Sequence, residues 1–352
     1  MGFEFSWKKG VLAAALTTGL FCGAGVAQAS TVEDIYKGQT VTIVIGHPPG
    51  GSYDLYAQLA AAHLGNFIPG NPNIIVEHMP GGGGRKGTAY FINKTAPDGL
   101  SLGIFPDTLG QTELLDPKKA NWKTAEFRYI GRFAPANAAF VVRKDAPATT
   151  VEDMRNTEIV VACTGKGSRS GQQPTAVRNL AGLKFRVICG YSGSEPAMLA
   201  TLRGETDMTS ENWASLASDT ANIDNGEIKV VFQAGLVRDP DLPNVPLMFE
   251  LTDDPEAQKV LRFISSGAPI GRSIMVHPNT SEEVISALSD AFQAMLKDPA
   301  FIEDAAKRQA IIDPESGEYV EGLSKEMMSA SPELIAAAMA AMDDSTADEL
   351  PK

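Results

Sequence analysis

Histidine and cysteine, the usual ligands of zinc, are scarce in this sequence. Its 352 residues include four histidines and three cysteines. The histidines, at positions 47, 63, 78 and 277, are scattered and have no ligand-like spacing to the cysteines. A zinc site needs several such side chains held close together. We therefore expect no metal site.

Basic residues are also few. The chain has 30 lysines and arginines against 43 aspartates and glutamates, which gives a formal net charge of −13. Nucleic acids and anionic membrane surfaces attract proteins of positive charge. The composition therefore argues against a nucleic-acid partner. It still permits an anionic ligand, because a small site can be locally positive on an acidic protein.

Long apolar runs occur only near the N-terminus. Lys8 and Lys9 precede an apolar run over residues 11–26, and Ala27-Gln28-Ala29 has the form of an export cleavage site. The run is short for a membrane-spanning anchor. We predict a signal peptide over residues 1–29, cleavage near Ala29, and a soluble exported protein.

Two cysteines, Cys163 and Cys189, lie beyond the predicted signal peptide. Each ends an apolar run typical of a β-strand. In an oxidising compartment the two could form a disulfide, whereas free buried thiols are also common at such positions. The sequence leaves both alternatives open.

Several enzyme motifs are missing as well. No Gly-Lys-Ser/Thr follows Gly50 and Gly51, and no G-x-G-x-x-G follows the first predicted strand, so phosphate-loop and dinucleotide-binding motifs are absent. Residues 190–194 lack the second glycine of a nucleophile elbow, and the histidines do not suggest a catalytic triad. We expect no cofactor and no catalytic residues. A hydrolase on an α/β scaffold is the enzyme alternative.

What is present is an alternation of strands and helices that occurs twice. The first round predicts strands at 41–45, 73–77 and 100–105, with helices at 54–64 and 88–94. The second predicts strands at 158–163, 185–189 and 207–210, with helices between them. This order predicts parallel strands joined by right-handed crossovers. Ligands of such sheets lie beyond the carboxyl ends of the strands.

Two arrangements fit this repeated pattern. The two βαβαβ units form either one doubly wound sheet or two lobes whose loops face each other across a cleft. In the second case, the extended passages at 130–142 and 228–236 would carry the chain between the lobes. The remainder is mainly helical. Thr149 with Glu152 resembles a capping box at the start of a short helix.

The loop after the first strand suits an anion. Gly50 and Gly51 permit a tight turn and leave backbone N–H groups uncovered, and we expect Ser52 or Asp54 to cap the helix that follows. The first N–H groups of a helix lack internal partners and carry partial positive charge. An ordinary turn that binds nothing is the alternative.

Five segments, taken together, resemble one protein family. They are Pro48-Pro49-Gly50-Gly51-Ser52-x-Asp54 and residues 76–84, 96–102, 191–207 and 241–246. In this order, over about residues 30 to 310, they resemble the substrate-binding proteins of the tripartite tricarboxylate transporters, the Bug-type receptors. Residues 249–274 fit that family's pattern poorly.

The resemblance implies a type II periplasmic-binding-protein fold, with two α/β lobes and a ligand cleft between them. Lobe 1 would comprise residues 30–137 and 234–352, and lobe 2 residues 138–233. The protein would capture a small carboxylate in the periplasm by lobe closure and deliver it to integral-membrane transporter subunits. The carboxylate could be a di- or tricarboxylate, an aromatic acid or an amino acid. We expect a monomer, and a carboxylate sensor for a signalling kinase is the alternative.

The resemblance also implies ligand contacts in both lobes. Backbone N–H groups of the first loop would hold one carboxylate. Arg169 would pair with a second carboxylate or remain solvated, and Asp207 would bind a ligand amine or hydroxyl, or cap a loop. Arg85 and Lys86 would add positive field to the site or form a solvated pair, and we expect the solvated pair. The expected ligand contacts are Pro49, Gly50, Gly51, Ser52, Tyr53, Thr108, Thr164, Gly165, Gly167, Ser168, Arg169, Tyr191 and Asp207.

Overall fold

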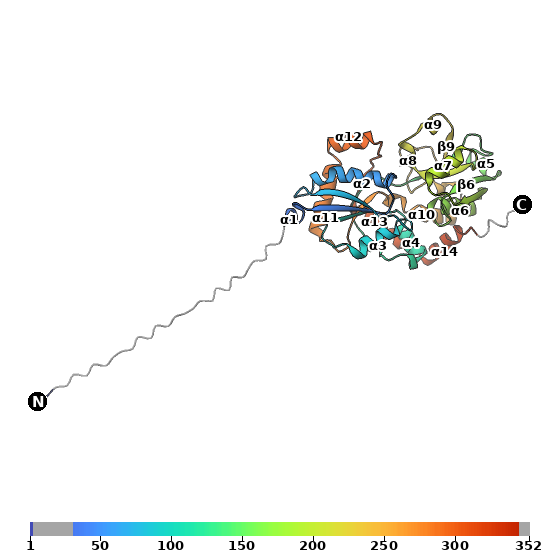
Figure 1. Cartoon of the computed structure of the whole chain (residues 1–352). Coiled ribbons are helices and arrows are strands. Elements are labelled where there is room, and N and C mark those ends of the chain that lie inside the picture. The colour runs from blue at the N-terminus through green and yellow to red at the C-terminus, as the bar shows by residue number, and fades with distance from the viewer. Residues whose placement is uncertain (3–30, 345–352) are drawn as a thin grey trace.

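The strands of this protein form two separate mixed sheets, which lie side by side in Figure 1. In spatial order, the first sheet contains β11 (Glu315–Ser316), β4 (Arg128–Arg132), β10 (Ser273–Val276), β3 (Ser101–Ile104), β1 (Thr40–Ile45) and β2 (Asn73–His78). The second contains β7 (Phe185–Cys189), β6 (Ile159–Cys163), β8 (Met208–Asn212), β5 (Ala138–Arg143) and β9 (Ile228–Ala234). Two sheets exclude the alternative of one doubly wound sheet.

The structure is a computed structural model that describes residues 1–2 and 31–344. The predicted export segment and its cleavage site therefore lie outside the described residues, apart from Met1 and Gly2. None of the helices formed by residues 31–344 has the length and apolar character needed to cross a membrane.

Helices flank both sheets. In chain order they are α1 (Val32–Tyr36), α2 (Ser52–His63), α3 (Arg85–Lys94), α4 (Leu109–Leu115), α5 (Val151–Met154), α6 (Arg169–Ala181), α7 (Ser194–Leu202), α8 (Trp213–Ala217), α9 (Ala221–Asp224), α10 (Pro255–Ser265), α11 (Glu282–Met295), α12 (Pro299–Lys307), α13 (Gly317–Met328) and α14 (Pro332–Ala341). Short 3-10 turns are η1 (Leu64–Asn66), η2 (Pro117–Lys119), η3 (Thr124–Glu126), η4 (Met248–Leu251) and η5 (Ala268–Ile270).

The two predicted βαβαβ units are confirmed. β1 pairs in parallel with β2 and β3, and β6 pairs in parallel with β7 and β8. The later strands β10 and β11 and the strands β5 and β9 complete the sheets with antiparallel pairs. The carboxyl ends of the parallel strands therefore bring their loops to one edge of each sheet, where the sequence predicts a site.

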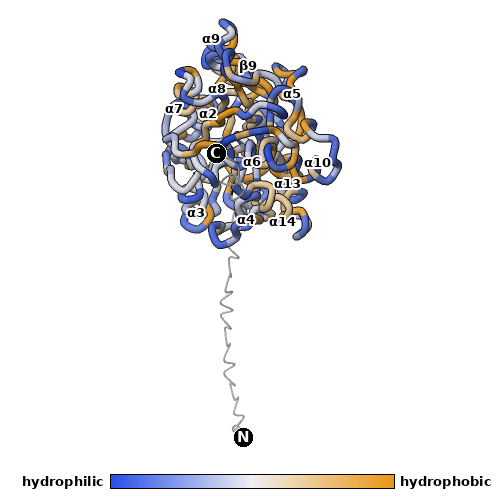
Figure 2. Tube along the Cα trace, turned by 90° about the vertical axis from the view of Figure 1, so that its right-hand side faces the viewer, coloured by the Kyte–Doolittle hydropathy of each residue, from blue (hydrophilic) through white to orange (hydrophobic). Residues whose placement is uncertain are grey.

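The apolar side chains of the strands are buried on both faces of the sheets. On β1, Val41, Ile43, Val44 and Ile45 are at most 1% exposed, as expected for a parallel strand covered by helices on both sides. Figure 2 shows hydrophilic residues gathered on peripheral segments such as the one that carries α9.

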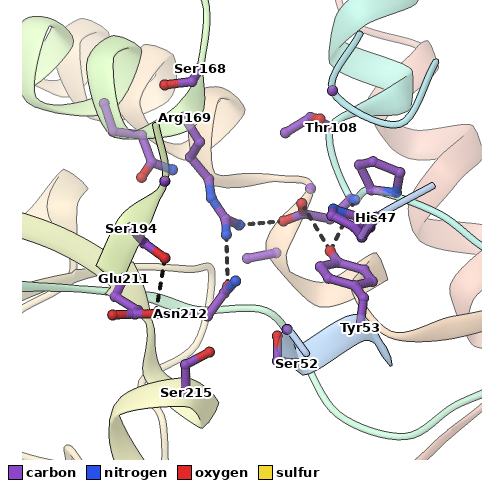
Figure 3. Close-up of a pocket in the computed structure, with 18 of the residues that line it drawn as sticks. His47, Ser52, Tyr53, Thr108, Ser168, Arg169, Ser194, Glu211, Asn212 and Ser215 are labelled. Atoms are coloured by element: carbon purple, nitrogen blue, oxygen red, sulfur yellow. Dashed lines mark hydrogen bonds and ion pairs between the residues drawn. The ribbon is translucent and has the colours of Figure 1, made fainter. Parts of the chain in front are cut away.

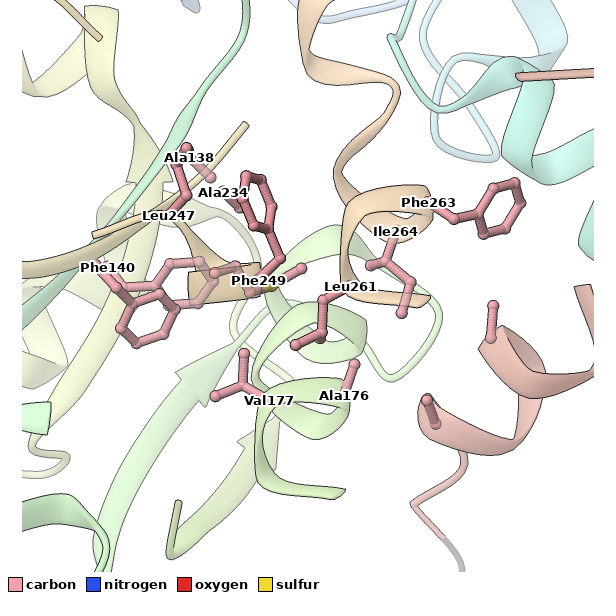
Figure 4. Close-up of a cluster of buried hydrophobic side chains, with 14 of the residues drawn as sticks. Ala138, Phe140, Ala176, Val177, Ala234, Leu247, Phe249, Leu261, Phe263 and Ile264 are labelled. Atoms are coloured by element: carbon pink, nitrogen blue, oxygen red, sulfur yellow. The ribbon is translucent and has the colours of Figure 1, made fainter. Parts of the chain in front are cut away.

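The chain returns to the first sheet later than predicted. After β9, Gln233 binds the carbonyls of Leu242 and Val245 through its side-chain amide, and η4 packs against β9. Helix α10 then packs on α6, where Leu261 lies beside Ala176 and Val177 in one buried cluster (Figure 4). The predicted crossing at 228–236 is therefore wrong. Residues 237–265 stay with the second sheet because their apolar side chains are buried there, and the chain crosses between α10 and β10.

One predicted helix cap is displaced by one residue. Helix α5 is capped by Thr150, whose hydroxyl accepts a hydrogen bond from the backbone N–H of Asp153 at 3.1 Å. The predicted cap was Thr149 with Glu152. Threonine occupies both position 149 and position 150, so the residue type alone does not decide which one caps the helix.

The structure joins Cys163 and Cys189 in a disulfide. The two residues are partners in the parallel register of β6 and β7, with their Cα atoms 4.4 Å apart. The bond ties together the loops that follow these strands. Both loops contribute to the site described below.

Reduction of this disulfide is expected to lower the free energy of unfolding by about 3 kcal/mol, because the cross-link restricts the unfolded chain. Urea unfolding with and without dithiothreitol would measure the change. A Cys163→Ala, Cys189→Ala double variant is the control and should not respond to the reductant. Equal stability of the oxidised and reduced wild type would contradict the expectation.

Candidate ligand-binding site

A cavity of about 1280 Å³ lies where the loops of the two sheets meet. We call its lining residues between positions 47 and 119 the first wall, and those between 167 and 222 the second wall. Nine of the predicted contacts line it: Pro49, Gly50, Gly51, Ser52, Tyr53, Thr108, Gly167, Ser168 and Arg169. Loops from both sheets thus converge on one space, as Figure 3 shows.

Four predicted contacts do not line this cavity. Thr164 is held within its own loop by the hydroxyls of Ser168 and Ser170. Gly165 accepts the hydrogen bond of the Ser168 hydroxyl, and the Tyr191 N–H donates to the carbonyl of Cys163. These residues shape the loops rather than face the cavity.

Asp207 lies at the opposite end of its sheet, and its predicted place in the cleft is corrected. Its carboxylate accepts a hydrogen bond from the N–H of Val160 at 2.8 Å and contacts Arg143 at 3.4 Å. Asp207 precedes β8, whereas the cavity lies beyond the carboxyl ends of the strands. Its role is to secure the start of β6.

The run of four glycines packs the first-wall loops together. Gly81 to Gly84 all have positive φ, a conformation that other residues rarely adopt. A Cβ on Gly84 would lie 2.4 Å from the ring of Pro106, and one on Gly46 would lie 2.8 Å from the Cα of Gly84. This close backbone approach explains Gly46 and Gly84 without a ligand, and the positive φ explains the other three. Beside them, Arg85 lines the cavity and Lys86 is exposed.

The N-terminus of α2 opens into the cavity. Its cap is Gly51, which offers no side-chain hydrogen bond, so neither Ser52 nor Asp54 caps the helix as predicted. Asp54 instead accepts from the Gly50 N–H at 2.8 Å and from His78 at 2.8 Å. Within the described chain, the N–H groups of Ser52 and Tyr53 have no protein acceptor. Such groups attract an anion.

Arg272 lies directly behind this helix end and is fully buried. Its guanidinium donates to the Ser52 hydroxyl at 3.2 Å and to the carbonyl of Pro135. Among residues 31–344, no carboxylate forms an ion pair with it, and its Nε has no hydrogen-bond partner. Burial raises the pKa of the nearby Asp239 carboxyl, and the charge of Arg272 opposes that shift only weakly. A buried cation without a paired anion is costly.

His47 is neutral in this site. Its ring stacks on Tyr53 with centroids 4.1 Å apart, and the Tyr53 hydroxyl bonds to Asp107 at 3.3 Å. Burial lowers the pKa of His47 from its ordinary 6.5 to about 4; Asp107 opposes this shift, and Arg169 and Arg272 add to it. Burial likewise raises the pKa of Tyr53.

The buried His47 should make the fold sensitive to acid. Above pH 6.5 the ring is neutral in both states, whereas at lower pH the unfolded chain takes up a proton that the folded site resists until about pH 4. The free energy of unfolding should therefore fall by about 2 kcal/mol between pH 7 and pH 5 through this group. His47→Phe keeps an aromatic ring at this position but cannot take up a proton. This variant should therefore lack the part of the stability loss at low pH that comes from His47. Equal pH dependence of urea unfolding in the two proteins would contradict this account.

Arg169 bridges the two walls. It lies at the start of α6 and donates to Asp107 of the first wall at 2.6 Å. It also donates to the side-chain oxygen of Asn212 at 2.7 Å and to the carbonyl of Ala136 at 3.1 Å. Figure 3 draws the bond to Asn212. Together these bonds use three of the five N–H donors of the guanidinium.

Sequence reasoning missed several polar residues of this cavity. His47 and Asp107 stood in loops that the sequence already placed at the sheet edge, but their types suggested no role. Glu211 and Asn212 end β8, where the loop rule could have found them. Arg272 lies in the stretch that fits the family pattern poorly. Residues 31–344 hold no group of three histidine, cysteine or acidic side chains that could bind a metal.

Comparisons with known proteins agree with this architecture. The profile of the tripartite tricarboxylate transporter family receptors matches residues 64–330. BugT of Bordetella pertussis is 24% identical over 302 residues, which cover 83% of this chain and 87% of BugT. A TctC solute-binding protein from Polaromonas has a TM-score of 0.65 at 22% identity, covering 89% of this chain and 99% of its own.

Another similar structure is MatC from Rhodopseudomonas palustris with bound malate. Its TM-score is 0.62 at 21% identity, and the match covers 87% of this chain and 99% of MatC. These structures confirm the periplasmic-binding-protein fold. The profile match spans most of the chain, and with it the chain belongs to the tripartite tricarboxylate transporter family receptors, which are solute-binding proteins rather than enzymes.

Proposed function

We propose that this receptor captures a small carboxylate in the periplasm and delivers it to the membrane subunits of a tripartite tricarboxylate-type transporter. The observation that carries the proposal is the pairing of an open helix end with a buried, unpaired Arg272. Both would favour a negative charge at the same point of the cavity. The malate bound to MatC supports a carboxylate as the ligand class.

Ser52 would connect Arg272 to the ligand. Because the Ser52 hydroxyl oxygen accepts from Arg272, its own proton remains available to a ligand oxygen. One ligand carboxylate would then accept hydrogen bonds from the Ser52 hydroxyl and from the N–H groups of Ser52 and Tyr53. Pro49, Gly50 and Gly51 line the cavity beside it.

Closure of two lobes around the ligand would provide the transport signal. We place residues 30–137 in lobe 1 and 138–233 in lobe 2, as the sequence predicts. The packing of residues 237–265 on the second sheet favours assigning them to lobe 2 as well. Gly167, Ser168 and Arg169 would meet the ligand from lobe 2, and Thr108 from lobe 1. A ligand that contacts both lobes stabilises the closed population.

A thermal-shift screen of the purified mature chain tests this function. A ligand that binds the native state alone raises the melting temperature. We expect at least one small mono-, di- or tricarboxylate, aromatic acid or amino acid to do so at millimolar concentration. Matched neutral amides should have no effect. A screen in which no carboxylate of any of these classes changes the melting temperature would contradict the proposal.

A further inference from the structure

The two walls of the cavity carry different charges. The first wall presents the open end of α2, with Arg272 behind it. Its own carboxylates, Asp107 and Asp116, are paired with Arg169 and Lys119. The second wall presents three carboxylates, Glu195, Glu211 and Asp219, and none of them forms an ion pair within the described part of the chain. Figure 3 shows Ser52 and Tyr53 on one side of the gap and Ser194, Glu211 and Ser215 on the other.

The only lysine or arginine among the described lining residues of the second wall is Arg169. Three of its five guanidinium N–H donors are bound to Asp107, Asn212 and the carbonyl of Ala136. A second ligand carboxylate on this side would have to share this guanidinium with Asp107 and approach uncompensated acidic groups. Like charges at short range disfavour that arrangement.

The second wall also offers hydrogen-bond acceptors that lack donors. Glu211 is half-buried and receives one bond, from the Ser194 hydroxyl at 3.1 Å. Gln173 on α6 lines the same cavity and is 3% exposed, and its side-chain oxygen has no hydrogen-bond partner. An oxygen of this kind can only accept a hydrogen bond, so a donor on the ligand would suit this side of the cavity better than a second carboxylate would.

We propose that the ligand is an ω-amino carboxylate, with a carboxylate at one end and a protonated amine at the other. This inference rests on the proposed function, because it takes the carboxylate to lie at α2. The ammonium group then faces the second wall and pairs with Glu211. A zwitterion of this kind carries a charge opposite to that of each wall, whereas a dicarboxylate is complementary to the first wall alone.

Calorimetric titration at pH 7 with matched ligand pairs tests the inference. Each pair has the same number of methylenes and differs at one end: β-alanine and succinate, γ-aminobutyrate and glutarate, δ-aminovalerate and adipate. We expect at least one amino acid to bind about 10-fold or more tightly than its diacid partner, a difference of about 1.4 kcal/mol. Glu211→Gln, which keeps an acceptor for Ser194, should remove most of that preference.

The control variant is Glu205→Gln, which changes an exposed glutamate outside the cavity and should leave the preference intact. Tighter binding of the diacid in every pair that binds would overturn the inference while supporting a carboxylate receptor. A preference that survives Glu211→Gln would overturn the role of Glu211. If no amino acid or diacid of the panel binds while the broader screen finds another carboxylate, the ω-amino ligand class is wrong. If that screen also fails, the proposed function itself fails.

Discussion

Gly51→Leu is expected to abolish carboxylate binding without unfolding the protein. Gly51 caps α2 with an ordinary φ of −90°, and a Cβ at this position would meet no atom within 4 Å. The leucine side chain would therefore enter the cavity at the point where the helix N–H groups meet the ligand. We expect at least a 100-fold loss of affinity, about 2.7 kcal/mol, with a melting temperature close to that of the wild type.

The measurement is titration of both proteins with whichever carboxylate gives the largest thermal shift in the wild type. Gly322→Leu is a matched control, because Gly322 is exposed on α13 and its Cβ would also meet nothing within 4 Å. This control should bind as the wild type does. Unchanged affinity in Gly51→Leu would show that the anion does not lie at the end of α2.

Arg272→Met should separate binding from stability. An apolar side chain avoids the desolvation cost of a buried, unpaired cation, although the Pro135 carbonyl loses its donor. We expect the free energy of unfolding of the ligand-free protein to change by no more than about 1 kcal/mol. Carboxylate affinity should fall by about 100-fold, because the positive charge behind Ser52 is gone.

Arg132→Met provides the opposite pattern. Arg132 is 5% exposed, and it binds the carbonyls of Pro269 and Asp313 away from the cavity. Its replacement should lower stability by about 2 kcal/mol and leave affinity unchanged. Urea unfolding would give the change in stability of each variant, and titration with the carboxylate would give the change in its affinity. A large loss of stability with normal affinity in Arg272→Met would mean that Arg272 serves the fold alone.

Local sequence patterns predicted the elements of this fold well. The alternation of apolar strands and Gly-rich loops predicted both βαβαβ units, and the loop rule brought Ser52, Thr108 and Ser168 to one cavity. These features depend on neighbours within a few residues. The same locality explains the small errors, such as the cap at Thr150 instead of Thr149.

Long-range relations were beyond the sequence. Arg272 and Ser52 are 220 residues apart, and no local pattern indicates that they touch. The guanidinium of Arg169 was expected to be free for a ligand carboxylate. Whether it is free depends on Asp107, which belongs to the first βαβαβ unit and pairs with Arg169. The late return crossing depended on α10 packing against α6. Asp207 was misplaced because the family motif was followed there, although the predicted strand at 207–210 puts Asp207 at its amino end, away from the loops that form the cavity.

The crystal structure of the receptor with its best-binding carboxylate tests the central claim most directly. The account predicts electron density for the ligand between the two sheets, with one carboxylate within hydrogen-bond distance of the Ser52 and Tyr53 N–H groups and the Ser52 hydroxyl. Ligand density elsewhere, with water alone at the end of α2, would contradict it.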